Sequence, residues 1–218
     1  FEEEICKYTC ASNAVAVSNG TVALRLALQI LKVKAGDEVL LPALSFVGTA
    51  NAISHLGAIP HFIDIEPDSL GMCPNALQQR LNEIAQKKGE VLINKKTDRK
   101  ISAILPVHIF GMPANMKKLV NIAKNYDLAL VEDAAEALGS WINTEETNQT
   151  HCGLFGDVGI ISFNGNKIIT SGGGGVLITN NNELAKAARH ISTTAKTPHP
   201  WEFNHDEIGW NDRMPNIN

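Results

Sequence analysis

Short apolar runs alternate with helix-forming stretches along almost the whole chain. Residues 38–44, 101–107 and 158–163 are apolar, of strand length and bounded by polar or turn residues, which is typical of buried strands. Residues 21–32 and 116–127 have the apolar spacing of helices. This alternation predicts an α/β fold with a mostly parallel sheet and helices on both of its faces.

The same patterns give bounds for individual elements. We expect the helix that begins at Thr21 to run to about Lys32, with Gly36 ending it. Residues 75–89 are expected to form one helix, and the polar and basic residues 90–100 an exposed insertion. Residues 142–151 are expected to form a loop, because they are polar and have no apolar periodicity.

Composition narrows the possible partners. The chain has 218 residues, of which 44% are hydrophobic, and a formal net charge of -4 with no dense Lys/Arg block. This argues for a sizeable core and for small-molecule ligands, and against nucleic acid or an anionic membrane as the main partner. No apolar run is long enough to span a bilayer. Four cysteines without a CxxC pair predict free thiols in a reducing cytoplasm rather than a zinc site or disulfides.

Ligands of open parallel sheets bind beyond the carboxyl ends of the strands, so the polar residues that follow each apolar run are candidates for a site. The first is the turn formed by residues 18–21, where unpaired backbone N–H groups at a helix start could receive a phosphate. A capped helix without a ligand is the more common explanation of such a turn.

Asp133 and Phe46 also follow predicted strands. A carboxylate at Asp133 could keep a pyridine nitrogen protonated, or it could cap a following helix. The ring of Phe46 could lie against a heteroaromatic ring, or it could pack in the core. Both alternatives stay open at this stage.

Lys167 lies in a turn just after a strand and shortly before four consecutive glycines. An amine used for imine chemistry must be reachable, and the glycines let the backbone pass close to a bulky ligand. Ser162 lies five positions earlier, within reach of a phosphate. His108 is expected to be a structural histidine, and His151 beside Cys152 lacks further ligands at metal-like spacing, so no metal is assigned.

The ordered motifs resemble those of the DegT/DnrJ/EryC1/StrS family of pyridoxal 5'-phosphate (PLP) dependent sugar aminotransferases, over nearly the whole chain. They read SNGT, GDEVLLPALSFVGTANAI, HIFG, VEDAAEALGS, SFNGNKIITSGGGGVLIT and GWNDRMPNIN. The likeness is closest to the LegC-like branch.

The resemblance implies a role for each matching residue. Lys167 would hold PLP as an internal aldimine and move protons, and Asp133 would pair with the pyridine nitrogen. Glu136 stands where many relatives carry the Gln or His that touches the phenolic oxygen of PLP. The other cofactor-binding residues implied are Gly20, Thr21, Phe46, Ser162 and Asn164, with Asn211 and Arg213 as candidates for contacts to the partner subunit's phosphate.

The resemblance also implies a fold and a reaction. Residues 1–218 would be the PLP-binding large domain of a type I, aspartate aminotransferase-like enzyme, a fragment without the small C-terminal domain, in a homodimer with shared active sites. The implied activity is transfer of an amino group from glutamate, through PLP, to the C4 keto carbon of a nucleotide-linked 6-deoxy sugar. Two alternatives remain: another type I PLP enzyme that acts on amino acids, and a catalytically silent PLP-binding module.

Overall fold

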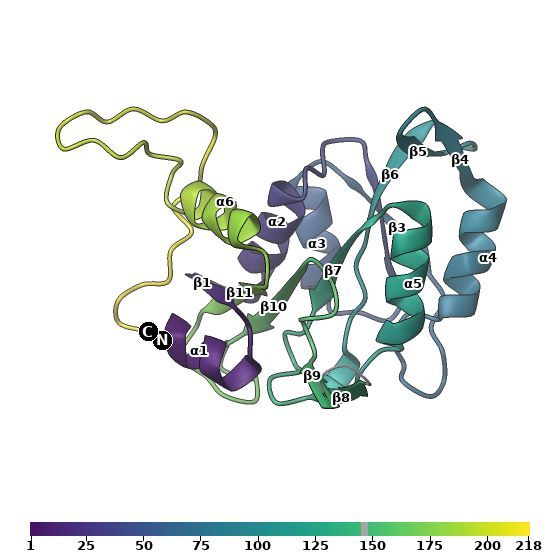
Figure 1. Cartoon of the computed structure of the whole chain (residues 1–218), viewed down its shortest axis with the longest axis horizontal. Coiled ribbons are helices and arrows are strands. Elements are labelled where there is room, and N and C mark those ends of the chain that lie inside the picture. Colours follow the sequence, from purple (N-terminus) through teal and green to yellow (C-terminus); the bar gives the residue numbers. More distant parts are fainter. Residues whose placement is uncertain (145–147) are drawn as a thin grey trace.

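The computed structural model describes residues 1–144 and 148–218. The elements in chain order are α1 (Glu2–Thr9), β1 (Asn13–Val17), α2 (Gly20–Ile30), β2 (Glu38–Pro42), α3 (Val47–His55), β3 (Ile59–Ile63), α4 (Pro74–Ile84), β4 (Ala85–Lys88), β5 (Val91–Asn94), β6 (Arg99–Ile104), the short 3-10 helix η1 (Ile109–Gly111), α5 (Met116–Tyr126), β7 (Ala129–Asp133), β8 (Trp141–Thr144), β9 (Asn148–His151), β10 (Val158–Ser162), β11 (Gly175–Thr179) and α6 (Asn182–Ser192). Strands and helices alternate as the sequence predicts (Figure 1).

The central sheet has the strand order β1-β11-β10-β7-β6-β2-β3. Strands β10, β7, β6, β2 and β3 run parallel to one another in this order, and β11 is antiparallel to both β10 and β1. Strand β5 pairs antiparallel with both β6 and β4. Helices α3 and α5 make the crossovers from β2 to β3 and from β6 to β7, the β8–β9 segment connects β7 to β10, and the glycine-rich connection after β10 allows β11 to turn back beside it. The predicted mostly parallel sheet is therefore confirmed, with two reversed strands, β11 and β5.

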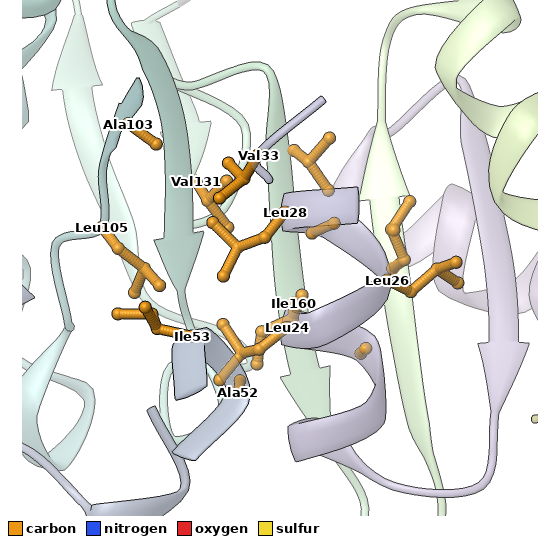
Figure 2. Packing of buried hydrophobic residues seen from close by; sticks show 14 of the residues in the cluster. Leu24, Leu26, Leu28, Val33, Ala52, Ile53, Ala103, Leu105, Val131 and Ile160 are labelled. Carbon is orange, nitrogen blue, oxygen red and sulfur yellow. The ribbon is translucent and has the colours of Figure 1, made fainter. Parts of the chain in front are cut away.

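Helices cover both faces of this sheet. Buried side chains from α2, α3 and α6 pack with one another against one face, and Figure 2 shows Leu24 and Leu28 of α2 facing Ile53 of α3, Val131 of β7 and Ile160 of β10. Buried residues of α4 and α5 form a second core on the other face, where α1 packs over β10 and β11. Burial of this apolar surface on both faces is the main stabilising contribution to such a fold.

Two predicted helix ends and one predicted exposure differ from the structure. Helix α2 ends at Ile30, and Gly36 lies in the following turn with a φ of 85°. The helix predicted for residues 75–89 ends at Ile84, because the next residues leave it to form β4, the first strand of a hairpin with β5. The insertion at residues 90–100 is not simply exposed, since Leu92 and Ile93 are each 7% exposed and contribute to the core.

The loop predicted for residues 142–151 is also wrong where the structure describes it. Strands β8 and β9 form an antiparallel hairpin, with Trp141 opposite His151 and Thr144 opposite Asn148. Cross-strand pairing overrides the polar composition that suggested a loop. Residues 145–147, part of the same prediction, lie outside the described residues. Among the described helices none has the length and apolarity that crossing a membrane requires.

Candidate functional site

A cavity of about 280 Å³ opens where helices α2 and α3 begin and strands β7 and β10 end. This is the carboxyl edge of the parallel strands, where ligands of open α/β sheets bind. The cavity gathers eight of the residues singled out from the sequence, namely Gly20, Thr21, Phe46, Asp133, Glu136, Ser162, Asn164 and Lys167. Side chains from four separate parts of the sequence thus converge on one concave surface.

The start of α2 forms one wall of the cavity. Asn19 caps this helix, and its side-chain oxygen accepts a hydrogen bond of 2.9 Å from the N–H of Val22. The earlier N–H groups of a helix have no intrahelical acceptor and carry the positive end of its dipole, so this wall favours an anion. Ser162 lies directly against it, since a Cβ added at Gly20 would come within 3.1 Å of the Ser162 Cβ.

Asp133 is buried at the end of β7 and accepts two hydrogen bonds. The Thr49 hydroxyl donates to Oδ2 at 2.7 Å, and the Ala135 N–H donates to Oδ1 at 3.2 Å. Burial raises the pKa of Asp133, although these two donors and the charges of His108 and Lys167 act against the rise. A turn, rather than a helix, follows Asp133, which excludes the helix cap as its explanation. Because a carboxylate can accept more than two hydrogen bonds, Asp133 can still accept one from a group bound in the cavity.

Lys167 reaches into the same cavity and is held there by Glu136. The Nζ of Lys167 lies 2.9 Å from Oε1 of Glu136, and the Lys167 side chain is only 12% exposed. The second oxygen of Glu136 accepts a 3.0 Å hydrogen bond from the backbone N–H of Phe110. Phe110 has a φ of 52°, a left-handed conformation that is uncommon for an aromatic residue. Glu136 therefore joins the lysine to a constrained stretch of backbone.

Phe46 lies at the mouth of the cavity, at the N-cap position of α3. Its side chain is 69% exposed, which excludes core packing as its explanation. The Nζ of Lys167 lies 5.8 Å from the centre of its ring. A Cβ added at Gly48 would come within 2.8 Å of the Thr21 Oγ1 and 3.0 Å of the Phe46 ring, so a glycine is needed for this close packing.

Asn211 and Arg213 do not line the cavity. They lie in the segment after α6, where Asn211 forms a backbone bridge to Thr193 and Arg213 forms one to Val17. Both are exposed. The two residues predicted to act on a partner subunit are thus placed apart from the other eight.

Two functional features were missed in the sequence. Thr49 donates to Asp133, and its place in the first turn of α3, beside Phe46, was the available signal. Glu132 is fully buried behind the cavity and accepts hydrogen bonds from the His108 ring and from backbone N–H groups between β9 and β10. This network holds His108 in the cavity wall, so the structural role predicted for that histidine fits its surroundings.

The fold and the site together define a type I transferase-like α/β domain whose pocket contains a lysine, a buried carboxylate and the start of a helix. A family model described as the DegT/DnrJ/EryC1/StrS aminotransferase family matches residues 1–218. The chain therefore belongs to this family, as the resemblance predicts.

Individual relatives agree with this assignment. A putative pyridoxal phosphate-dependent aminotransferase, EpsN, of Bacillus subtilis (strain 168) is 39% identical over 217 residues, covering 100% of this chain and 52% of the relative. GDP-perosamine synthase of Escherichia coli O157:H7 is 36% identical and is covered to 54%. The crystal structure of a DegT DnrJ EryC1 StrS aminotransferase from Brucella abortus matches 99% of this chain and 54% of its own, with a TM-score of 0.86 and 30% identity. The predicted type I fold is confirmed, and the chain spans about half the length of these relatives.

Proposed function

We propose that this chain is the PLP-binding large domain, residues 1–218, of an enzyme that transfers an amino group from glutamate to a keto carbon, C4, of a nucleotide-linked 6-deoxy sugar. The observation that carries the proposal is the placement of Lys167 Nζ in one cavity with the Asp133 carboxylate and the start of α2. A relative named as a putative pyridoxal phosphate-dependent aminotransferase and another named as a GDP-perosamine synthase support this proposal. The LegC-like branch and the C4 position stay predictions.

The polar and aromatic groups that line the cavity match the chemical groups of PLP. A phosphate suits the start of α2, with Gly20, Thr21 and Ser162 around it. The acceptor capacity of Asp133 suits a protonated pyridine nitrogen, which would supply the positive charge that this buried carboxylate lacks. The exposed ring of Phe46 is available to stack on the cofactor ring, and Asn164 lines the same cavity. The residues present therefore match each chemical part of the cofactor.

When bound, PLP supplies an electron sink for the amino carbon. Lys167 would form the covalent link to its aldehyde carbon, and the freed amine would carry a proton between the donor's α-carbon and the cofactor. Glu136 already contacts the Lys167 nitrogen and is fixed by the Phe110 N–H. Its carboxylate would keep that nitrogen in place at the cavity.

A homodimer with shared active sites is part of the proposal. The segment after α6 extends from the body of the domain as a long loop, on which Trp201, Phe203 and Ile208 are each more than 70% exposed (Figure 1). Exposed apolar groups of this size are typical of a contact surface. Asn211 and Arg213, at the end of this loop, would reach the phosphate bound by the partner subunit.

The two alternatives predict different substrates. An enzyme acting on amino acids alone would need no sugar nucleotide, and a silent module would bind PLP without turnover. The purified protein should therefore be assayed with glutamate and a panel of UDP-, GDP- and dTDP-linked 4-keto-6-deoxy sugars. We expect amino transfer to at least one sugar and its loss in Lys167→Ala.

The matched control is Lys186→Ala, which removes an exposed lysine paired with Glu183 on α6. This variant should retain activity. Absence of transfer to every sugar in the panel, with glutamate leaving the PLP absorbance unchanged, would favour the silent module. A glutamate response with amino transfer only to 2-keto acids would favour an amino-acid enzyme.

A further inference from the structure

One charged residue interrupts the otherwise apolar buried face of α2. Arg25 is buried in a helix whose other buried residues are all Gly, Ala, Leu or Ile. Its side chain is 8% exposed, and its guanidinium pairs with the carboxylate of Asp212, whose side chain is 13% exposed. A buried ion pair contributes little net stability compared with apolar residues of similar volume, because both charges lose their hydration. This pair therefore calls for an explanation other than stability.

The guanidinium of Arg25 is held in one orientation. It lies 4.3 Å from the centre of the Trp210 ring, and its Nη1 donates to Gln29 Oε1 at 3.2 Å. The Trp210 indole N–H donates to the same Gln29 oxygen at 3.0 Å. Arg25, Gln29, Trp210 and Asp212 form one hydrogen-bonded and stacked group, called here the Arg25 clamp. The clamp fixes residues 210–212 on the side of α2.

The clamp is connected directly to the start of the same helix. The backbone carbonyl of Asp212 accepts a 2.8 Å hydrogen bond from the N–H of Ser18, the residue before the N-cap Asn19. A ring of contacts is thus closed: Arg25 pairs with Asp212, Asp212 accepts a hydrogen bond from Ser18, and the first turn of α2 leads from Ser18 back to Arg25. Arg25 is about one and a half turns from Gly20, so the path is short and stiff.

The other end of the clamp is anchored on α6. The N–H groups of Trp210 and Asp212 donate to the carbonyls of Ile191 and Ser192 at 2.7 and 3.0 Å. Residues 211–213 alternate in exposure, with Asp212 turned inward and Asn211 and Arg213 exposed. The clamp therefore sets the place of the two exposed side chains as well as the angle at which the chain enters α2.

We propose that Arg25 and Asp212 are positioning residues that hold the start of α2 in the geometry needed to bind a phosphate group. This inference rests on the proposed function, because the phosphate is that of PLP. The pair acts through the Ser18 N–H and the N-terminal turn of α2, and it touches neither the ring nor the aldehyde of the cofactor. Its loss should weaken recognition of the phosphate and leave recognition of the ring unchanged.

The test compares PLP with pyridoxal, which has the same ring and aldehyde but no phosphate. Dissociation constants of both are measured by absorbance titration for the wild-type protein, Asp212→Asn and the double variant Arg25→Met with Asp212→Asn. The quantity of interest is the ratio of the pyridoxal constant to the PLP constant. We expect this ratio to fall by about fivefold or more in both variants, the lower end of usual coupling between two sites. Pyridoxal affinity should stay within about twofold of the wild type.

The double variant separates positioning from stability. Asp212→Asn alone leaves Arg25 as an uncompensated buried charge and should lower the urea midpoint, whereas the double variant should recover much of that loss. The ratio of the pyridoxal constant to the PLP constant should stay low in both the single and the double variant. Glu38→Gln, which breaks a buried polar network at the far end of the sheet, serves as the control for destabilisation and should keep the wild-type ratio.

Other outcomes overturn the inference. An unchanged ratio in the double variant, or an equal loss of affinity for PLP and pyridoxal, means that the clamp does not act on the phosphate. A wild-type protein that binds PLP no better than pyridoxal overturns both this inference and the proposed phosphate site. A wild-type protein that binds neither overturns the proposed function itself.

Discussion

Two buried carboxylates at opposite ends of the central sheet differ in how fully they are hydrogen-bonded. Glu38, the first residue of β2, is 2% exposed and accepts hydrogen bonds from His61, Asn94 and Thr97 at 2.6 to 2.9 Å. Asp133, the last residue of β7, is 5% exposed and accepts one from a side chain and a longer one from the backbone.

The contrast is reflected in the acid strength of the two groups. Burial alone would raise the pKa of both carboxyls, but the three side-chain donors lower the pKa of Glu38, whereas the pKa of Asp133 remains raised. A carboxylate with a full set of donors fixes the structure around it. A buried carboxylate with too few donors, facing a cavity, is suited to a positively charged ligand group.

The largest expected effect distinguishes the two carboxylates by activity. Asp133→Asn should lower kcat on the order of 10²–10³, the size seen when one preorganised electrostatic partner is removed. The cofactor-free protein should lose no stability, because the substitution removes a poorly compensated buried charge. Steady-state kinetics and urea unfolding measure the two quantities. A variant that unfolds more easily while keeping its kcat would reverse the roles assigned here.

Glu38→Gln should have the opposite profile. The amide nitrogen of glutamine cannot accept the hydrogen bonds that the carboxylate accepts, which should cost about 1–3 kcal/mol of unfolding free energy. PLP affinity and kcat should match the wild type, because Glu38 lies at the end of the sheet away from the cavity. Equal stability in the variant, measured by urea unfolding, would mean that the network around Glu38 holds nothing in place.

Thr49→Val sharpens the comparison by removing one of the two donors to Asp133. The substitution keeps the shape of the side chain, and one hydrogen bond to a charged group contributes about 1.5–3 kcal/mol. We expect kcat to fall by about tenfold, a smaller loss than in Asp133→Asn, because Ala135 still holds the carboxylate. Thr97→Val is the matched variant at Glu38. It should change stability and leave kcat unaltered.

The smallest expected effect is a difference in pH dependence of the cofactor-free protein. The pKa of Asp133 is raised on folding, so its contribution favours the folded state at low pH and fades as pH rises from about 3.9 through the raised value. The pKa of Glu38 is lowered on folding, so its contribution is present above about pH 4.3 and is lost as pH falls toward the lowered value. Urea unfolding is measured across this pH range for the wild type, Asp133→Asn and Glu38→Gln. The difference in unfolding free energy between wild type and variant should fall with rising pH for Asp133→Asn and rise with pH for Glu38→Gln. If the two differences change with pH in the same direction, the pKa values of Asp133 and Glu38 do not shift in opposite directions on folding.

The sequence alone predicted the parts of the fold that depend on local periodicity. The alternation of strands and helices was correct, and so was the gathering of Lys167, Asp133 and Ser162, because each lies at or just after the carboxyl end of a strand in the parallel part of the sheet. The hairpin of β4 and β5 was missed, because its strand character comes from cross-strand pairing and from burial of Leu92 in the core formed with α4 and α5.

The partners of the site residues were harder to predict. Thr49 meets Asp133 across 84 positions of sequence, and Arg25 meets Asp212 across 187. Nothing in the local pattern around either residue specifies such a partner. Burial and donor count, which separate Asp133 from Glu38, are properties of the folded chain only.

The central claim is that the Lys167 nitrogen forms the covalent bond to PLP. Reduction of the PLP-loaded protein with borohydride, followed by digestion and mass spectrometry, measures this directly. We expect a single pyridoxyl group on the peptide that contains Lys167, and none in Lys167→Ala. A label on another lysine, or no label on a protein that binds PLP, would contradict the account.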